Sequence, residues 1–358
     1  MKRSASPTQL DKNLQEIDAL FSVAGLVRNR RGTPAGITRE LRKTRIARLT
    51  SEELSVAAPE PIVSANGAQW LPVSEWAAPQ KSAIKWLWHG FSTRLGGVSR
   101  AYCPDDAPGE LNLGFTANDP RENVLRNRAL LGEAVTGSES TPLVTLRQIH
   151  SNLVVHVGKK DIGRERPWKG DGLMTSEPGL LLGIQTADCI PVLVADRKRR
   201  AVAAFHAGWR GTVKRIVETG IGRMRLEFGS RPEDLVAAIG PGNSVCCYAV
   251  GEEVFSSFES QFAYARELFC EVYDSDPVRT KYPMLFLTQR APGHSPIGPA
   301  LHLDLVEANR RQLLDAGLKP GAIKVVHGCT NCQRDLFFSH RASGGRAGRM
   351  MSVIGIRG

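Results

Sequence analysis

Three residues that can do chemistry stand where apolar runs of the sequence begin or end. His150 lies between two apolar runs in RQIHSNLVVHV, Cys189 opens the run CIPVLVAD, and His206 follows AVAAF. The ends of strands, and the loops beside them, are where a scaffold presents functional side chains. Two histidines and one cysteine form a ligand set for zinc, and three protein ligands leave a fourth position open to water, as in a catalytic site.

The same three residues allow two other interpretations. In a metal-free site, Cys189 would be the nucleophile and a histidine would be its base. A single histidine or cysteine on an apolar run is also a common buried core residue. Spacing alone does not separate these interpretations.

Cys189 and His206 are expected on two neighbouring strands. Residues 185–211 read QTADCIPVLVADRKRRAVAAFHAGWRG, which is two apolar runs joined by the basic turn DRKRR. This pattern predicts a β-hairpin. The two side chains approach each other only if the register of the hairpin places them on the same face.

The remaining cysteines have a weaker pattern. Cys329 and Cys332 form a C-x-x-C pair in HGCTNCQRD, which is half of a zinc site or a redox pair. No second C-x-x-C accompanies it, and the H-x-E of a nucleobase deaminase does not precede it. Cys246 and Cys247 are adjacent, so one is expected to face the core and the other to face away. We therefore expect a structural or incidental role for the C-x-x-C pair and no chemistry for Cys246 and Cys247.

A glycine-rich loop with several arginines is the candidate anion site. Arg341, Arg346 and Arg349 lie in FFSHRASGGRAGR, where no acidic residue stands among them. Guanidinium groups match phosphate or carboxylate, and glycines let backbone N–H groups approach an anion. The alternative is a solvated basic loop without a ligand.

The elements that must position these residues follow no simple alternation. Short β-branched runs predict strands, and apolar residues at helical spacing predict helices. The expected strands are residues 143–149, 153–157, 180–184, 192–195, 201–205, 235–239, 337–339 and 351–356, and the expected helices are 213–228, 250–262, 302–316 and one that begins at Asp119 and Pro120. Because strands and long helices do not alternate strictly, we expect an α/β (α+β) single domain whose mixed β-sheets are flanked by helices.

Composition and charge disfavour several classes of protein. Of 358 residues 42% are hydrophobic, and no apolar run reaches the roughly 20 residues of a membrane span. The seven cysteines form no dense framework, and the first residues carry no apolar signal segment, so we expect a cytoplasmic protein. The net charge of +11 permits contact with nucleic acid, but no helix-turn-helix, zinc finger or stacked-aromatic motif supports that partner.

The chain is expected to divide near Gly67. Residues 1–67 are poor in aromatics, with a basic section followed by small residues and proline. Such a composition predicts a mobile extension, with two short helices at 10–26 and 38–49. An arm that binds a partner is the alternative. Residues 68–358 are expected to form the catalytic domain.

Six motifs, in order, resemble the YfiH-type laccase-domain family, whose members are also called multicopper polyphenol oxidoreductases or peptidoglycan editing factors. The motifs are LNLGFTANDPRENVLRNR, RQIHSNLV, DGLMTSEPGLLLGIQTADCIPVLVAD, AAFHAGWRGT, AAIGPGNSVCCYAVGEEV and CTNCQRDLFFSHRASGGRAGRMMSVI. They cover about residues 86–358, and TADC followed by HAGWRG is highly specific. The resemblance implies a cytotoxic-necrotizing-factor-like fold and a zinc site made by His150, Cys189 and His206.

The resemblance also implies an enzyme of purine nucleosides and phosphate. Such enzymes phosphorolyse adenosine, inosine, guanosine and methylthioadenosine, and they deaminate adenosine. For deamination, Asp171 and Asp188 are the candidates that would move protons. For phosphorolysis, Arg341 and Arg349 fall on the family's SYR and GR positions and are the candidates that would hold phosphate.

Some positions are weaker or depart from the family. Asn112, Arg147 and Gln148 are further candidate contacts with nucleoside or phosphate. His340 stands where the family usually has tyrosine, so this chain lacks that hydroxyl. The long basic extension is not part of the family's common pattern.

The names of the family leave two other activities open. A peptidoglycan-editing hydrolase, which would remove misplaced L-Ser from wall precursors, would use Cys189 as nucleophile and His150 as base. A copper-dependent polyphenol oxidase is less favoured, because blue-copper oxidases need several His-x-His pairs and the sequence contains none. Zinc is therefore the expected metal, and the oligomeric state stays open.

Overall fold

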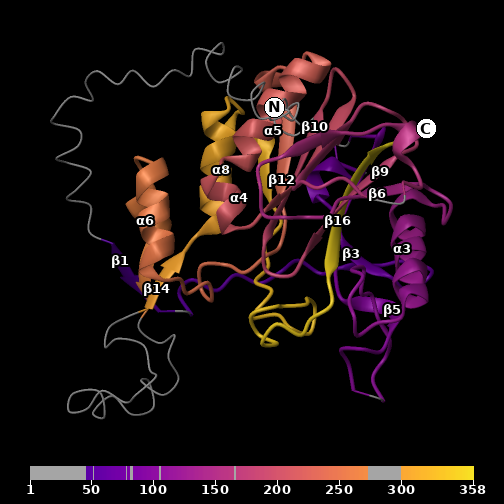
Figure 1. Cartoon of the computed structure of the whole chain (residues 1–358), viewed down its shortest axis with the longest axis horizontal. Helices are drawn as coiled ribbons and strands as arrows, with labels where there is room; N and C mark the ends of the chain where they lie inside the picture. Colours follow the sequence, from indigo (N-terminus) through magenta and orange to yellow (C-terminus); the bar gives the residue numbers. More distant parts are fainter. Residues whose placement is uncertain are drawn as a thin grey trace, which may run out of the picture. The chain divides into compact units, whose positions relative to one another are not determined.

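The structure is a computed structural model that describes residues 46–50, 52–77, 79–80, 84–104, 106–164, 167–272 and 300–358. Figure 1 shows how their helices and strands are arranged. The unit they belong to runs from Ile46 to Gly358. The helix expected at residues 10–26 lies outside the described residues. Among the helices that the structure describes, none combines the length and the apolar character needed to cross a bilayer.

The expected hairpin lies at the centre of a six-stranded sheet. Strands β10 (Ile190–Asp196) and β11 (Ala201–Ala207) pair antiparallel, which confirms the hairpin. All residues of both strands are buried, so the apolar runs are continuous rather than alternating. The strand order is β15-β12-β10-β11-β8-β7, and the outer members are β15 (Ile323–Val325), β12 (Leu235–Ile239), β8 (Gly172–Thr175) and β7 (Val154–His156).

A second six-stranded sheet is built around the end of the chain. Strand β16 (Met350–Ile356) lies between β4 (Leu87–Ser92) and β9 (Leu181–Thr186) and is antiparallel to both. The full order is β2-β3-β4-β16-β9-β6, in which β2 is Ile62–Val63, β3 is Gln69–Leu71 and β6 is Leu143–Thr145. Both sheets mix parallel and antiparallel pairs, because β6 is parallel to β9 and β7 is parallel to β8.

The two sheets pack face to face, and helices cover their outer faces. Between the sheets lies one apolar core with Phe91, Ile184, Leu193, Ala204 and Ile354 among its members. A second core lies under helices on the outer face of the first sheet. A third core joins the outer face of the second sheet to α3 (Arg121–Thr136). This layered arrangement confirms the expected mixed α+β single domain.

Four of the described helices cover the outer face of the first sheet. They are α4 (Trp209–Val213), α5 (Ile216–Phe228), α6 (Glu252–Gln261) and α8 (Leu305–Asp315). Helix α5 lies so close to β11 that a Cβ on Gly220 would collide with the ring of Phe205. The helix expected at residues 213–228 is present as α5, but it begins only at Ile216, because Arg215 adopts a left-handed φ of 61° and separates α5 from α4.

A small third sheet includes residues from the predicted extension. Its order is β1-β13-β14, with β1 at Ala47–Leu49, β13 at Phe269–Val272 and β14 at Ala300–Leu303. The helix expected at residues 38–49 is wrong at its end, since Ala47–Leu49 is a strand. Strands β1 and β2 both precede Gly67. The expected boundary near Gly67 between an extension and a catalytic domain stays a prediction.

Three other expectations differ from the structure in detail. Pro120 is the N-cap of α3 and not its first helical residue. His302 belongs to β14, so α8 begins only at Leu305. The strand expected at residues 337–339 is wrong, because Phe337 and Phe338 are buried between the sheets from a loop. The apolar residues at 337–338 thus indicate burial but do not form a strand.

Candidate active site

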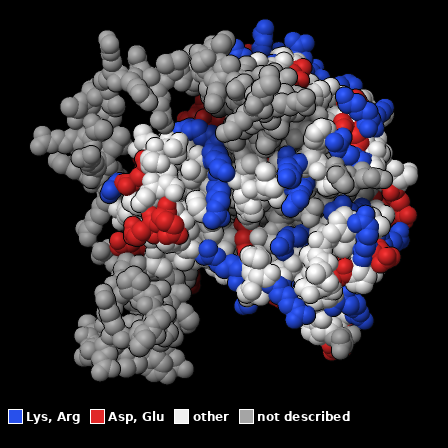
Figure 2. Space-filling view, viewed as in Figure 1, with Lys and Arg blue, Asp and Glu red and all other residues white. Residues whose placement is uncertain are grey.

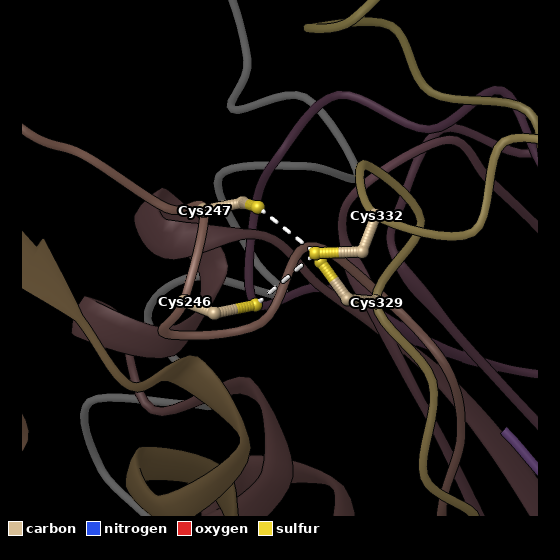
Figure 3. A group of neighbouring side chains, drawn as sticks. All are labelled: Cys246, Cys247, Cys329 and Cys332. Atoms are coloured by element: carbon tan, nitrogen blue, oxygen red, sulfur yellow. Dashed lines mark hydrogen bonds between the residues drawn. The ribbon is translucent and has the colours of Figure 1, made fainter. Parts of the chain in front are cut away.

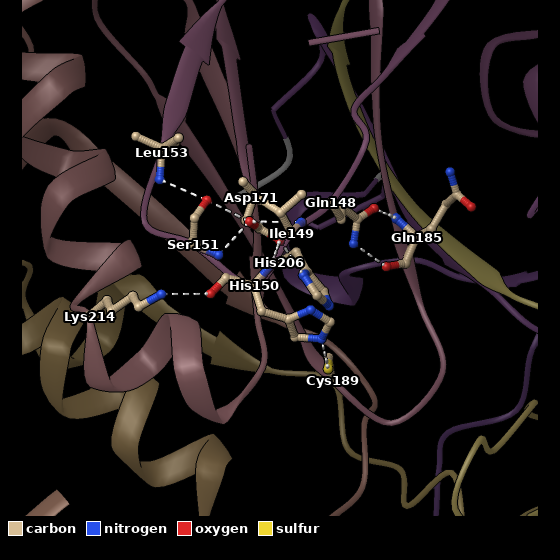
Figure 4. Close-up of polar contacts among 10 residues, drawn as sticks. All are labelled: Gln148, Ile149, His150, Ser151, Leu153, Asp171, Gln185, Cys189, His206 and Lys214. Atoms are coloured by element: carbon tan, nitrogen blue, oxygen red, sulfur yellow. Dashed lines mark hydrogen bonds and ion pairs between the residues drawn. The ribbon is translucent and has the colours of Figure 1, made fainter. Parts of the chain in front are cut away.

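His150, Cys189 and His206 come together at one end of the first sheet (Figure 4). Cys189 immediately precedes β10, His206 lies on β11, and His150 is in the loop between β6 and β7. In the hairpin Pro191 is opposite His206, so Cys189, two residues before Pro191, projects on the same side as the histidine. One ligand atom from each of the three side chains lies within 4.8 Å of the other two.

The three side chains differ in exposure, which leaves the cluster open on one side. His206 is 4% exposed, whereas Cys189 is half-buried and His150 is exposed. The Sγ of Cys189 is 3.9 Å from Nε2 of His150, and the centroids of the two imidazole rings are 4.9 Å apart. A small molecule can therefore approach from the side of His150.

A fully buried carboxylate, Asp171, holds the cluster from behind. Its oxygens accept hydrogen bonds from Nδ1 of His206 at 2.8 Å and from the N–H groups of Ile149, His150 and Ser151. The hydroxyl of Ser151 donates to it as well, at 2.7 Å. One carboxylate thus fixes both the loop that carries His150 and the ring of His206. Because Nδ1 of His206 is engaged, its Nε2 is left for the cluster.

The backbone of the same loop is strained. His150 has a φ of 56°, in the left-handed region that residues other than glycine rarely adopt. Three consecutive N–H groups that point at Asp171 account for this conformation. Backbone strain of this kind is often found at functional sites.

The pKa values of these groups are displaced by their neighbours. Burial by itself would raise the pKa of Asp171, but hydrogen bonds from His206 and Ser151 lower it to about 2. Burial would also raise the pKa of Cys189, but the charge of His206 and a hydrogen bond with His150 lower it to about 6. Burial opposes the charge of His206, yet the Cys189 thiolate and Asp171 raise its pKa to about 9. Without a metal, the cluster at neutral pH is thus a thiolate beside an imidazolium.

Gly208 shapes the floor of the cluster. A Cβ at this position would lie 2.8 Å from Sγ of Cys189 and 3.1 Å from Cδ2 of His150. Glycine is therefore needed after His206 so that the backbone can pass beneath the other two ligands. The HAGWRG motif contains this glycine, but the sequence interpretation assigned it no role.

The donor set fits a zinc ion. Thiolate sulfur and imidazole nitrogen are both zinc ligands, and the lowered pKa of Cys189 supplies the thiolate that zinc requires. The carboxylate of Asp171 bound to the remote nitrogen of His206 is the usual outer partner of a metal-binding histidine. His150, Cys189 and His206 could therefore hold the metal, with Asp171 behind them.

Asp188 directly precedes Cys189 and links the cluster to the segment around residues 330–341. Its Oδ1 accepts hydrogen bonds from the hydroxyls of Thr330 and Ser339, both at 2.7 Å, and its Oδ2 accepts one from the N–H of Arg341 at 2.7 Å. Its own carbonyl accepts from the N–H of Asn243. Asp188 also has a left-handed φ, of 90°. These contacts describe a residue that positions loops.

Tyr248 is a neighbour of Cys189 that the sequence interpretation missed. Burial, and then the charge of Cys189, raise the pKa of Tyr248 above its usual range. The guanidinium of Arg341 lies 4.7 Å from the centre of the Tyr248 ring, and its Nη1 donates to the carbonyl of Ala249. The signal in the sequence was a tyrosine directly after two cysteines, which by itself carries no functional meaning.

Other predicted contact residues have their polar groups engaged within the protein. The buried amide of Asn112 bonds to Gly114, to Asp119 and to the N–H of Arg349. The guanidinium of Arg349 donates to the carbonyls of Ala347 and Gly348, next to it in the chain.

Gln148 and Arg147 lie just before the histidine loop. The amide of Gln148 makes two hydrogen bonds with the backbone of Gln185, at 2.7 and 2.8 Å, and so ties that loop to the end of β9. The backbone of Arg147 pairs with Trp168 and Gly170, and the residue is exposed. The structure thus places Gln148 as a link to the segment that leads to Cys189.

Cations lie next to the cluster. Nζ of Lys214 donates to the carbonyl of His150 at 3.3 Å, and the exposed Arg210 stacks 4.3 Å from the ring centre of Trp209. In Figure 2 acidic side chains gather over α6, whereas Lys and Arg are spread over the rest of the visible surface. Lys214 thus places a positive charge beside the loop that carries His150.

Comparisons with known proteins agree with the resemblance expected from the motifs. A family model described as multi-copper polyphenol oxidoreductase laccase matches residues 88–357. The purine nucleoside phosphorylase of Bacteroides thetaiotaomicron is 35% identical over 271 residues, which cover 74% of this chain and 90% of that protein. The adenosine deaminase RL5, from an unknown prokaryotic organism, is 30% identical over 270 residues, which cover 74% and 92%.

A solved structure shows the same fold. The hypothetical protein YfiH of Bacillus licheniformis aligns with a TM-score of 0.66 at 30% identity, over 83% of this chain and 99% of that one. The expected fold class is confirmed by this likeness and by the mixed sheets described above.

Proposed function

We propose that this chain, which belongs to the multi-copper polyphenol oxidoreductase laccase family, is a zinc-dependent enzyme of purine nucleosides. It would phosphorolyse adenosine, inosine, guanosine and methylthioadenosine and deaminate adenosine. One observation carries the proposal: His150, Cys189 and His206 converge on an open site. This occurs in a chain whose relatives include a purine nucleoside phosphorylase and an adenosine deaminase.

The metal we propose is zinc, held by His150, Cys189 and His206. Bound there, zinc would supply Lewis-acid chemistry at an open fourth position. Copper oxidation by several metal centres is less well supported. Among the described residues, the one other group of three or more possible His, Cys, Asp or Glu ligands contains no histidine.

The acidic residues near the proposed metal would fix the protonation and the orientation of its ligands. Asp171, whose pKa is about 2, would keep the proton of His206 on Nδ1 and so direct Nε2 to the metal. We propose this positioning role for Asp171 in place of proton transfer, because it is buried and accepts several hydrogen bonds. We propose the same kind of role for Asp188, whose two oxygens accept three hydrogen bonds.

The cations at the rim would bind phosphate. In phosphorolysis a phosphate oxygen forms a bond with C1′ of ribose, the bond between C1′ and the purine nitrogen breaks, and the base leaves with a proton. Arg341 and Lys214 would hold the anion near the cluster, since both are fixed beside it by hydrogen bonds to backbone carbonyls. In deamination, water would add at C6 of adenine and ammonia would leave.

The test is metal content together with product analysis on adenosine. With phosphate we expect free adenine and ribose 1-phosphate, and without it inosine and ammonia. Cys189→Ala and His206→Ala should each lose this metal and both activities, whereas Cys103→Ser, in a loop after β5 (Leu95–Ser99), should keep them. A wild-type protein that binds no metal and releases neither base nor ammonia would rule the proposal out.

A second candidate function is supported by the lowered pKa of Cys189. A thiolate beside a histidine is also the arrangement of a metal-free nucleophile, as a peptidoglycan-editing hydrolase would need. Such an enzyme would cleave muramyl peptides and keep its activity after chelation of metals. The purine nucleoside enzyme would lose activity on chelation and leave muramyl peptides intact.

A further inference from the structure

Four cysteine side chains from two distant segments converge near the candidate active site (Figure 3). Cys246 and Cys247 lie between β12 and α6, and Cys329 and Cys332 follow β15. All four sulfur atoms lie within 4.8 Å of one another. The Sγ of Cys332 is 3.6 Å from that of Cys246 and 3.2 Å from that of Cys247. All four are free cysteines.

The expectation that Cys246 and Cys247 point in opposite directions is wrong. Cys246 is buried as expected, but both sulfurs lie beside Cys332. The reason is a tight turn in which the N–H groups of Cys247 and Tyr248 both donate to the carbonyl of Ser244. Alternation of side chains holds for extended strands and not for such a turn.

The spacing of the sulfurs matches a tetrahedral thiolate site. With zinc–sulfur bonds of about 2.3 Å, tetrahedral geometry places ligand sulfurs about 3.8 Å apart. The distances of 3.2 and 3.6 Å, and the limit of 4.8 Å on all the others, bracket that value. In Figure 3 the four sulfurs point toward a common centre.

The backbone holds the two segments together independently of any ligand. Gly242 forms a β-bridge with Cys329, and the N–H of Thr330 donates to the carbonyl of Gly242 at 3.0 Å. The N–H groups of Cys332 and Ser244 are hydrogen-bonded to the sulfur of Cys329. These two N–H groups come from both segments and fix the position of the Cys329 sulfur between them.

We propose that Cys246, Cys247, Cys329 and Cys332 bind one structural zinc ion. Four thiolate ligands complete the coordination of zinc and leave no position for water, so this site would stabilise structure and would not catalyse. The site is separate from the one made by His150, Cys189 and His206, and no ligand is shared between them.

The proposed ion would brace the wall of the active site. Thr330, next to Cys329, donates its hydroxyl to Asp188 at 2.7 Å, and the N–H of Asn243 donates to the carbonyl of Asp188 at 2.7 Å. Asp188 in turn precedes Cys189. Both segments that the ion would join therefore contact the residue beside the reactive thiol, and the four cysteines would act as positioning residues.

The first test counts zinc in the full chain purified under reducing conditions. We expect about two zinc ions per chain in the wild type, about one in Cys332→Ser and about one in the double variant His150→Ala, His206→Ala. Cys332 is exposed, so its replacement leaves the core intact, and the matched control Cys270→Ser, a buried thiol on β13, should keep about two. A Cys332→Ser protein with undiminished zinc would overturn the inference.

The second test identifies the ligands. In the variant His150→Ala, His206→Ala, whose first site is dismantled, zinc X-ray absorption should show four sulfur neighbours at about 2.3 Å. Nitrogen or oxygen neighbours, or the absence of zinc from this variant while its circular dichroism is that of the wild type, would overturn the inference. So would a disulfide between Cys247 and Cys332 in the reduced preparation. Loss of the proposed nucleoside activity alone would leave these results unaffected.

Discussion

The two sulfur clusters of this domain are linked through Asp188 but differ in the residues that form them and in their exposure. The first joins one thiol to two imidazoles, with the buried carboxylate of Asp171 behind them. The second joins four thiols with no imidazole among them. The first is open on the side of His150, and its three proposed zinc ligands would leave room for a substrate. The second offers four proposed ligands, which would leave no open position on the zinc ion.

The neighbours of each cysteine determine its acidity. The charge of His206 outweighs the effect of burial and lowers the pKa of Cys189 to about 6. Partial burial, followed by hydrogen bonding with Cys247, raises the pKa of Cys332 above its usual range. Cys332 is nevertheless the more exposed of the two. Exposure alone therefore does not identify the reactive cysteine, and the charges around the sulfur do.

The largest difference between the clusters should appear in activity. Cys189→Ala removes a ligand of the proposed catalytic zinc, and a loss of about 4 kcal/mol of catalysis would lower kcat/KM about 1,000-fold. Cys332→Ser would weaken only the contacts that position Asp188. Its kcat should therefore stay within about threefold of the wild type, which corresponds to a loss of about 0.7 kcal/mol of transition-state stabilisation. Steady-state phosphorolysis of adenosine measures both. If both variants lost the same activity, the proposal that only the first cluster is catalytic would be wrong.

Alkylation of the metal-stripped protein tests the acidity of the two thiols. At pH 7 about nine-tenths of Cys189 would be thiolate, whereas Cys332, whose pKa is raised, would be almost entirely protonated. The lower intrinsic nucleophilicity of the more acidic thiol offsets part of this difference, and we expect Cys189 to be labelled at least about tenfold faster than Cys332. Mass spectrometry of peptides labelled with iodoacetamide gives both rates.

The pH dependence has a defined sign. The labelling rate of Cys189 should rise about tenfold per pH unit up to about pH 6 and then level off, because the thiolate is the reactive form. His206→Asn removes the charge that lowers this pKa, so it should move the rise to higher pH. A Cys332 that reacts before Cys189 at pH 7 would contradict the assignment.

Asp171→Asn would remove the carboxylate behind the first cluster, a feature that the second cluster lacks. We expect zinc affinity or activity to fall about 10- to 100-fold, as for other outer partners of metal-binding histidines. Zinc titration against a chelator measures the affinity. Asp161→Asn removes a carboxylate that caps the short turn Lys159–Asp161, and it should leave the affinity unchanged. If both variants bind zinc as the wild type does, Asp171 does not orient His206.

The smallest effect should come from the floor of the first cluster. In Gly208→Ala the new methyl group would press on Sγ of Cys189, and a strain of about 1.4 kcal/mol would weaken zinc binding about tenfold. Gly222→Ala is the matched control, because a Cβ there meets nothing within 4 Å. An unchanged affinity in Gly208→Ala would mean that the floor yields and that glycine is not required.

Much of the architecture could be predicted from the sequence because it rests on local pattern. The hairpin of β10 and β11 and the strand β12 were readable from apolar runs bounded by turn residues. Residues 337–339 carry the same kind of apolar signal and form a buried loop. Burial and extended structure produce the same signal over three residues, so length alone could not separate them.

The candidate site could be predicted only in part. Residue type pointed to His150, Cys189 and His206, but the role of Asp171 depends on a loop that turns three N–H groups toward it. Tyr248 and Gly208 had no signal of their own, since their importance lies in what stands next to them.

What the sequence by itself determined is the set of ligand types and the local elements that carry them. Only the tertiary structure decided which cysteines meet, because Cys246 and Cys332 are brought within 3.6 Å by the pairing of β12 with β15 and the bridge that follows it. A pattern along the chain records which residues are available. The distance between two residues far apart in the chain depends on sheet order and loop path, which are set by packing across the whole domain.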